Sequence, residues 1–186
     1  MTSPAAPSLT ENQRALADAV VDVERHVAAL GWDAPTRVFA LVSTQAALLA
    51  EPELANQLPD ATVQAALDDP HHLTSVEQDE LPETDALEDL LASITWPDAV
   101  IGTAVVVERI ILPPSAEKEI PDDPAAALVY LSDHPDRQDV RMAVGVLRDG
   151  VSWCAVRTRA NDSDNDVAVG ADLVPGLIDG LLSTFE

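Results

Sequence analysis

The chain lacks several features that define whole classes of proteins. Its 186 residues contain one cysteine, Cys154, so no intramolecular disulfide can form, and its apolar strand-like setting predicts an inert buried thiol. The longest run without a charged residue, 38–50, is shorter than the roughly 20 apolar residues that cross a bilayer. Residues 1–9 hold no Lys or Arg and no apolar stretch, which argues against a secretory signal. We therefore expect a soluble cytoplasmic protein without membrane contact.

Basic residues are also scarce. Ten Lys and Arg stand against 33 Asp and Glu, a formal net charge of −23. No basic residue lies between Arg37 and Arg109, whereas segment 137–159 contains five arginines. Such an acidic surface repels phosphate backbones and anionic lipids, so we expect no nucleic-acid partner. The acidic stretch itself is typical of a solvated surface that resists aggregation.

Aromatic residues make up only 3% of the chain, yet the chain is apolar enough to fold. Hydrophobic residues account for 47%, and the mean hydropathy is +0.06. Disorder requires low hydrophobicity together with high charge, and only the second condition is met. The length suits one hydrophobic core. We expect residues 1–9 to be a flexible N-terminus and residues 10–186 to be a single domain.

Hydrophobic periodicity in the first two thirds of the chain predicts helices and two strands. The apolar spacing of 11–30 predicts an amphipathic helix, which Thr10 and Gln13 begin as a capping box. Segment 44–94 is interrupted by prolines and predicts several short helices, one of them with capping-box spacing at Thr74 and Glu77. Segments 37–43 and 100–112 are apolar and rich in β-branched residues, which predicts two strands. Segment 123–131 begins with Asp-Pro, which predicts a short helix.

The last third contains the clearest local pattern. Segments 140–147 and 151–159 flank Asp149-Gly150, which favours a hairpin with a type I′ turn. A short strand at 167–169 and a helix at 173–185, capped by Asp172, are expected to follow. Helices and strands do not alternate regularly. We therefore predict an α+β fold with an antiparallel or mixed sheet of about four to five strands and helices packed mainly on one face.

No motif for a cofactor or a catalytic centre is present. The chain has no glycine-rich phosphate loop, nucleophile elbow or dinucleotide fingerprint. The aspartates at 162, 164 and 166 alternate like calcium ligands, but Val167 and Leu173 stand where a calcium loop needs Gly and Glu, so a solvated loop is favoured. The four histidines lack zinc-site spacing. We expect no cofactor, no metal and no catalytic residue.

Five residues are candidates for binding. Glu108 and Arg109 interrupt an apolar strand, and one of the two faces either a partner or a charge on a neighbouring strand. Strand alternation places Trp153, Arg157 and Arg159 on one face, where guanidinium groups and an aromatic ring suit an anion-binding or protein-binding patch. The alternative is that these arginines pair with the protein's own carboxylates.

Several short segments of the sequence are distinctive when taken together. They are Gly31-Trp32-Asp33, Trp96-Pro97-Asp98-Ala99-Val100, Val107-Glu108-Arg109, the segment 134–142 and Leu173-Val174-Pro175-Gly176-Leu177. With these segments the chain resembles an uncharacterised family of acidic cytoplasmic proteins from high-GC Gram-positive bacteria, the actinobacteria. The resemblance covers nearly the whole chain after residue 10 and implies a cytoplasmic actinobacterial protein, without an activity or site residue to transfer.

Three classes of function stay open. The charge-segregated surface, without an assembled chemical site, favours a non-enzymatic protein-binding or adaptor protein, which binds another protein or itself as a homodimer. A small-molecule-binding domain is the first alternative, and a deep apolar pocket with convergent polar groups would indicate it. An enzyme with a carboxylate-based site near Glu108 is the second, and a cleft with two titratable groups would indicate it.

Overall fold

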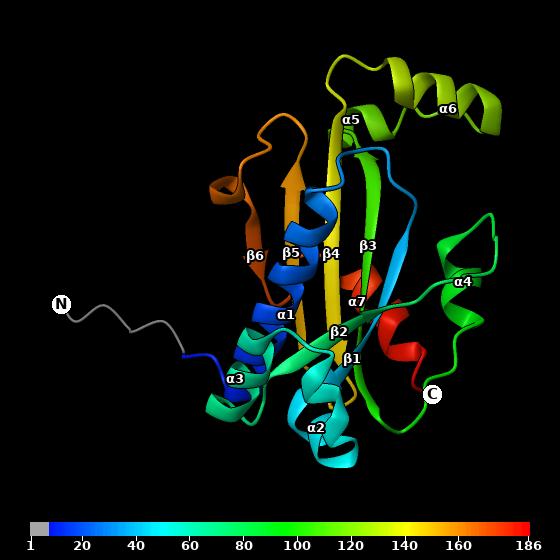
Figure 1. Cartoon of the computed structure of the whole chain (residues 1–186). Helices are drawn as coiled ribbons and strands as arrows, with labels where there is room; N and C mark the ends of the chain where they lie inside the picture. The colour runs from blue at the N-terminus through cyan, green and yellow to red at the C-terminus, as the bar shows by residue number, and fades with distance from the viewer. Residues whose placement is uncertain (1–7) are drawn as a thin grey trace.

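The computed structural model describes residues 8–186, which form one antiparallel sheet flanked by helices (Figure 1). The sheet has six strands in the order β2-β1-β3-β4-β5-β6, and every neighbouring pair is antiparallel. Of the predicted flexible N-terminus, 1–9, residues 1–7 lie outside the described part of the chain. The strands are β1 (Arg37–Ser43), β2 (Leu73–Glu77), β3 (Val100–Ile111), β4 (Gln138–Leu147), β5 (Ser152–Thr158) and β6 (Ala168–Gly170).

Helices precede β1, follow β6 and occupy every connection between strands except the β4–β5 hairpin. None within residues 8–186 is long and apolar enough to cross a membrane. The α-helices are α1 (Glu11–Ala28), α2 (Thr44–Ala50), α3 (Asp60–Asp68), α4 (Leu87–Ala92), α5 (Pro114–Glu117), α6 (Pro124–Asp133) and α7 (Pro175–Ser183), and the short 3-10 helices are η1 (Pro52–Asn56) and η2 (Asp164–Asp166).

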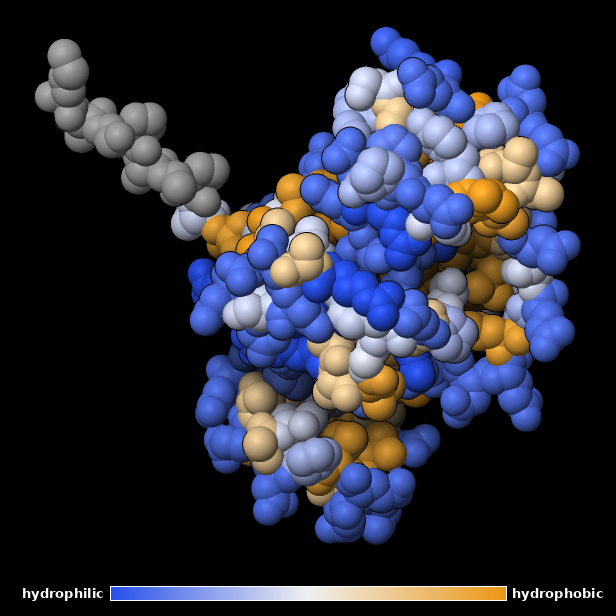
Figure 2. Space-filling view, turned by 90° about the horizontal axis from the view of Figure 1, so that it is seen from above, coloured by the Kyte–Doolittle hydropathy of each residue, from blue (hydrophilic) through white to orange (hydrophobic). Residues whose placement is uncertain are grey.

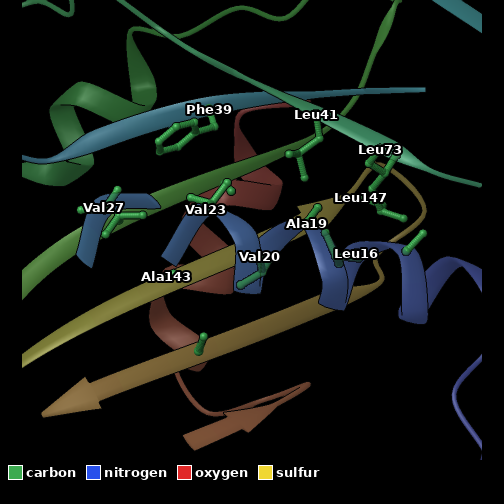
Figure 3. Packing of buried hydrophobic residues seen from close by; sticks show 14 residues of the cluster. Leu16, Ala19, Val20, Val23, Val27, Phe39, Leu41, Leu73, Ala143 and Leu147 are labelled. Atoms are coloured by element: carbon green, nitrogen blue, oxygen red, sulfur yellow. The ribbon is translucent and has the colours of Figure 1, made fainter. Parts of the chain in front are cut away.

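α1 covers one face of the sheet. Its apolar stripe, which includes Leu16, Val20 and Val23, packs onto strand residues that point toward it (Figure 3). Gly145 of β4 permits this close approach, because a Cβ atom there would lie 2.5 Å from Val20 Cγ2. The predicted capping box is confirmed at the start of the helix, where Gln13 N donates to Thr10 Oγ1 at 3.2 Å.

α4 and α7 cover the opposite face. Successive β3 residues divide between the two sides, since Val106 belongs to the core under α1 and Val105 and Val107 to the core with α7. The α+β class and the antiparallel sheet are confirmed. The sheet has six strands instead of four to five, and its helices lie on both faces instead of mainly on one, because the continuous apolar run of β3 is buried on both sides.

Three local predictions are wrong. Leu73–Glu77 is strand β2, not a helix start, because Leu73 is buried in the core and Thr74 Oγ1 pairs with Thr44 Oγ1 at 2.7 Å. The β4–β5 hairpin forms as predicted, but only Gly150 has a positive φ, whereas a type I′ turn needs two such residues. α7 starts at Pro175 without a side-chain cap, so Asp172 does not cap it.

Candidate functional site

Three charged residues lie side by side on the sheet face that α1 covers. Glu108 of β3 is directly opposite Arg141 of β4, and Arg141 is directly opposite Arg157 of β5. Two adjacent guanidinium groups repel each other, so each needs a carboxylate. Carboxylates and an aromatic ring from other elements meet this row. We call the whole set the charge layer: Glu24, Trp32, Glu108, Arg141, Arg157, Asp162 and Asp164.

Arg157 is the centre of an internal ion-pair network. It is only 2% exposed, and its Nε and Nη2 atoms donate to the two oxygens of Glu24 at 2.6 and 2.8 Å. It also donates to Asp162 at 3.2 Å and to Asp164 at 2.7 Å. These bonds, that to Glu24 first, raise the pKa of Arg157. The guanidinium group therefore joins α1, β5 and the following loop and is not open to an external anion.

Arg141 holds the loop that follows α1. It is fully buried, and its Nη2 donates to Glu108 Oε1 at 2.9 Å and to the Gly31 carbonyl. Its guanidinium carbon lies 4.3 Å from the centre of the Trp32 ring, a cation–π contact. Trp32 Nε1 donates in turn to Asp162 at 2.9 Å, and this bond, followed by that from Arg157, lowers the pKa of Asp162.

Arg159 extends the same network to the surface. It makes two bonds of 2.9 Å to the carboxylate of Asp33, and its guanidinium carbon lies 5.6 Å from the Trp32 ring. Asp33 has a φ of 65°, and its backbone N–H donates to Glu108 Oε2 at 2.8 Å. The pairing lowers the pKa of Asp33 and raises the pKa of Arg159. Both oxygens of Glu108 are thus engaged in holding the loop.

The five sequence-predicted binding residues are divided between interior and surface. Trp153 and Arg157 share the α1 face as predicted, but Trp153 is half-buried against the core and Arg157 is buried. Arg159 and Arg109 are exposed, and Arg109 donates to the Glu108 carbonyl at 2.9 Å. For Glu108, Arg157 and Arg159, the geometry matches the alternative of pairing within the protein. One open patch of all five residues does not exist.

The sequence interpretation missed Glu24, Trp32 and Arg141 as parts of this site. A signal for Glu24 was available, because it falls on the apolar stripe of α1, one residue after Val23 and four after Val20. A carboxylate in that position is buried and needs a cation. Trp32 follows the helix in an irregular loop, and no periodicity assigns it to a neighbour.

The alternating aspartates and the single cysteine have defined surroundings in the structure. Asp162 and Asp164, two of the three alternating aspartates, bind Arg157, so the loop is paired with the protein as well as solvated. Within residues 8–186, no group of three or more His, Cys, Asp or Glu side chains is placed to hold a metal ion. Cys154 is buried in the core beside α7, and this burial raises the pKa of its thiol.

A second feature stands clear of the sheet. Ile111 and Gln138 are direct partners on β3 and β4, yet 26 residues, 112–137, connect them. We call this connection the arm. It contains α5 and α6, and Figure 1 shows α6 projecting beyond the end of the sheet. Tyr130 Oη donates to the Ala116 carbonyl at 3.2 Å and fixes α6 to α5.

The outward side of α6 is apolar. None of its residues is buried, and Leu128 and Val129 are 66% and 61% exposed. Ile110 and Ile111, where β3 leads into the arm, are also exposed. The view from above the sheet end shows a mainly hydrophilic surface broken by apolar patches (Figure 2).

The arm differs from the other long connections. The β1–β2 connection, 44–72, also has exposed leucines, Leu49 at 77% and Leu67 at 68%, but it buries Thr44 and Ala66. The β2–β3 connection buries Leu90 and Leu91 against α7. Both therefore contribute to the core. The arm buries Leu112 and Ala116 ahead of α6, but α6 itself contributes no buried residue.

A cavity of about 340 Å³ lies beside the start of α1. Its wall is mainly apolar and includes Leu73, Ile101 and Leu147. Polar groups meet at its rim, where His71 Nδ1 lies 2.9 Å from Asn12 Oδ1. This arrangement has the features of a small ligand site, although it is open to solvent on one side.

The fold and these sites define an α+β protein with a six-stranded antiparallel sheet, a charge layer centred on the buried Glu24, Arg141 and Arg157, and a projecting apolar arm. The chain belongs to the PPA1309-like protein family, whose model matches residues 16–186. PPA1309 is a protein of Propionibacterium, an actinobacterium, which agrees with the resemblance found in the sequence. No curated protein and no solved structure matches the chain.

Proposed function

We propose that this protein is a non-enzymatic protein-binding or adaptor protein and that its arm contacts the partner. The observation that carries the proposal is the 26-residue insertion between Ile111 and Gln138, two residues that already pair. Antiparallel neighbours need a connection of only about two to five residues. The sheet therefore does not require the arm, and its helix leaves its apolar side exposed.

The energetics favour contact with another surface. Full burial of one Leu or Val side chain stabilises by about 1.5–3 kcal/mol, and Leu128 and Val129 retain most of that potential. An isolated helix shorter than about 12 residues is also marginal in water. α6 has ten residues. Binding of the apolar helix side in a partner's groove would bury these side chains and stabilise the short helix, and it is a common mode of recognition.

A pair of matched double variants tests the proposal. Leu128→Asp with Val129→Asp places charges on the outward side of α6, and Leu49→Asp with Leu67→Asp does the same to comparably exposed leucines of the β1–β2 connection. Each full-length protein is used to capture partners from the cells in which the chain occurs, and sedimentation velocity measures self-association. We expect the α6 variant alone to lose its partner, or its self-association, with an unchanged melting temperature.

Two results count against the proposal. If both double variants retain the same bound proteins and the same sedimentation coefficient as the wild type, the arm is not a binding element. If only the Leu49→Asp and Leu67→Asp protein loses them, the β1–β2 connection is the contact surface instead.

Small-molecule binding is a second candidate, favoured by the cavity beside α1. Its apolar wall and its polar groups at Asn12 and His71 match two parts of the criterion set from the sequence, whereas its open side does not match the expected depth. Native mass spectrometry of the protein purified from its own cells tests it. A bound mass that His71→Leu removes supports a ligand, and an unliganded mass in both proteins contradicts one.

The carboxylate-based enzyme near Glu108 receives the least support. One oxygen of Glu108 accepts from Arg141 and the other from the backbone of Asp33, and bonds to the ionised form make the carboxylate a weaker general base. We therefore assign Glu108 a positioning role in the charge layer.

A further inference from the structure

The chemistry of the arm also restricts the kind of partner that it can bind. The outward side of α6 is apolar at its centre and acidic at both ends, with Asp122 and Asp123 before the helix and Asp133 as its last residue. A helix of ten residues is about 15 Å long, which separates the two acidic ends by that distance. In all, the arm carries six Asp and Glu against Lys118 and Arg137.

The acidic residues at the two ends differ in their relation to the helix dipole. Asp123 accepts from Ala126 N at 2.9 Å and caps the positive end, where a carboxylate stabilises the helix. Asp133 lies at the negative end, where a cation is favourable. Arg137 already supplies a cation there, since its Nη1 donates to the Ser132 carbonyl at 2.5 Å while its Nη2 donates to Asp139. Neither bond involves the Asp133 carboxylate, which is left for a basic group of an interacting surface.

We infer that the partner of the arm is a protein segment whose apolar ridge is flanked by Lys or Arg on both sides. This inference rests on the proposed function of the arm. A second copy of this chain is disfavoured as the occupant, because it presents the same six carboxylates. A membrane surface with anionic lipids is disfavoured for the same electrostatic reason.

Two synthetic peptides serve as probes. Both are amphipathic helices with the same Leu and Ala face, one flanked by Lys and the other by Glu. Fluorescence anisotropy measures their dissociation constants with the full-length protein at low and at physiological ionic strength. We expect the Lys-flanked peptide to bind at least about tenfold more tightly, with a difference that shrinks as salt is added.

Isosteric neutralisation separates the arm from the general acidity of the chain. The arm variant combines Asp122→Asn, Asp123→Asn and Asp133→Asn, and Asn at 123 preserves the N-cap. The control combines Glu51→Gln, Glu53→Gln and Asp60→Asn and removes the same charge elsewhere. We expect the arm variant to bind the Lys-flanked peptide about tenfold more weakly and the control to stay within about twofold. Circular dichroism verifies that both variants keep the wild-type fold.

Several results overturn the inference. Equal binding of the two peptides, or equal weakening by the two triple variants, means that the arm does not select a basic partner. Self-association that Leu128→Asp with Val129→Asp abolishes means that a second copy is the occupant. Arm-dependent cosedimentation with vesicles of phosphatidylcholine and phosphatidylserine means that a membrane is. If the native partner is lost in that double variant while both peptides bind alike, the proposed function stands and only this inference fails.

Discussion

Excision of the arm tests whether the fold needs it. Replacing residues 112–137 by Asn-Gly joins Ile111 to Gln138 through the shortest hairpin turn. The variant loses the burial of Leu112 and Ala116, which are 4% and 6% exposed, at a cost of about 2–4 kcal/mol. Shortening a 26-residue connection to two residues lowers the free-energy cost of closing the loop by about 2 kcal/mol. This gain offsets most of the lost burial.

Urea unfolding followed by tryptophan fluorescence and circular dichroism measures the result. We expect one cooperative transition and a free energy of unfolding within about 2 kcal/mol of the wild type. A control in which a Gly-Ser linker of equal length replaces the arm retains the loop-closure cost and is expected to be about 2 kcal/mol less stable than the Asn-Gly protein. Loss of the cooperative transition in the Asn-Gly protein, or a loss of more than about 5 kcal/mol, refutes the view that the sheet is independent of the arm.

Further predictions concern the core, the charge layer and metals. Arg157→Met leaves Glu24 buried without a cation and is expected to lower the free energy of unfolding in urea by about 3–5 kcal/mol. Replacing both residues by Met is expected to recover much of that free energy, and equal losses in the two variants would contradict a direct pair. Gly145→Ala is expected to cost about 1–3 kcal/mol and Gly176→Ala, in open space, to cost little; the reverse order would contradict the packing of α1. The folded state lowers the pKa of Asp162 below 3.8, so the contribution of Asp162 to the stability of the fold is complete above that pH and is lost as the pH falls through the folded-state pKa. An NMR titration that gives an unshifted pKa for Asp162 would refute this. Chelation is expected to leave the melting temperature unchanged, and a fall of several degrees would indicate a metal.

Local chemistry made much of the fold predictable. The capping box at Thr10 and Gln13, the Asp123-Pro124 helix start and the Asp149-Gly150 hairpin depend on adjacent residues, and each is present. β2 was missed because its pairing with β1 is decided by residues about 30 positions away. The same spacing of Thr74 and Glu77 suits a helix cap or an edge strand, and only the tertiary contact separates them.

The candidate sites were harder to predict, for a related reason. From strand alternation alone, Arg157 and Arg159 are equivalent surface residues whose replacement costs little. Burial separates them, because Glu24 of α1 reaches Arg157 from 133 positions away while Arg159 stays exposed beside Asp33. Of the arm, the sequence predicted only the short helix at 123–131. Its significance depends on the direct pairing of the strand ends on either side of it.

Crosslinking from the arm in living cells is the most direct test of the central claim. A photoreactive phenylalanine derivative replaces Leu128 in the full-length protein, or Leu67 as a control of nearly equal exposure, at 66% and 68%. If the arm is the binding element, position 128 forms a discrete crosslinked protein product that position 67 does not form. Identical products from both positions, or none from position 128, would contradict it.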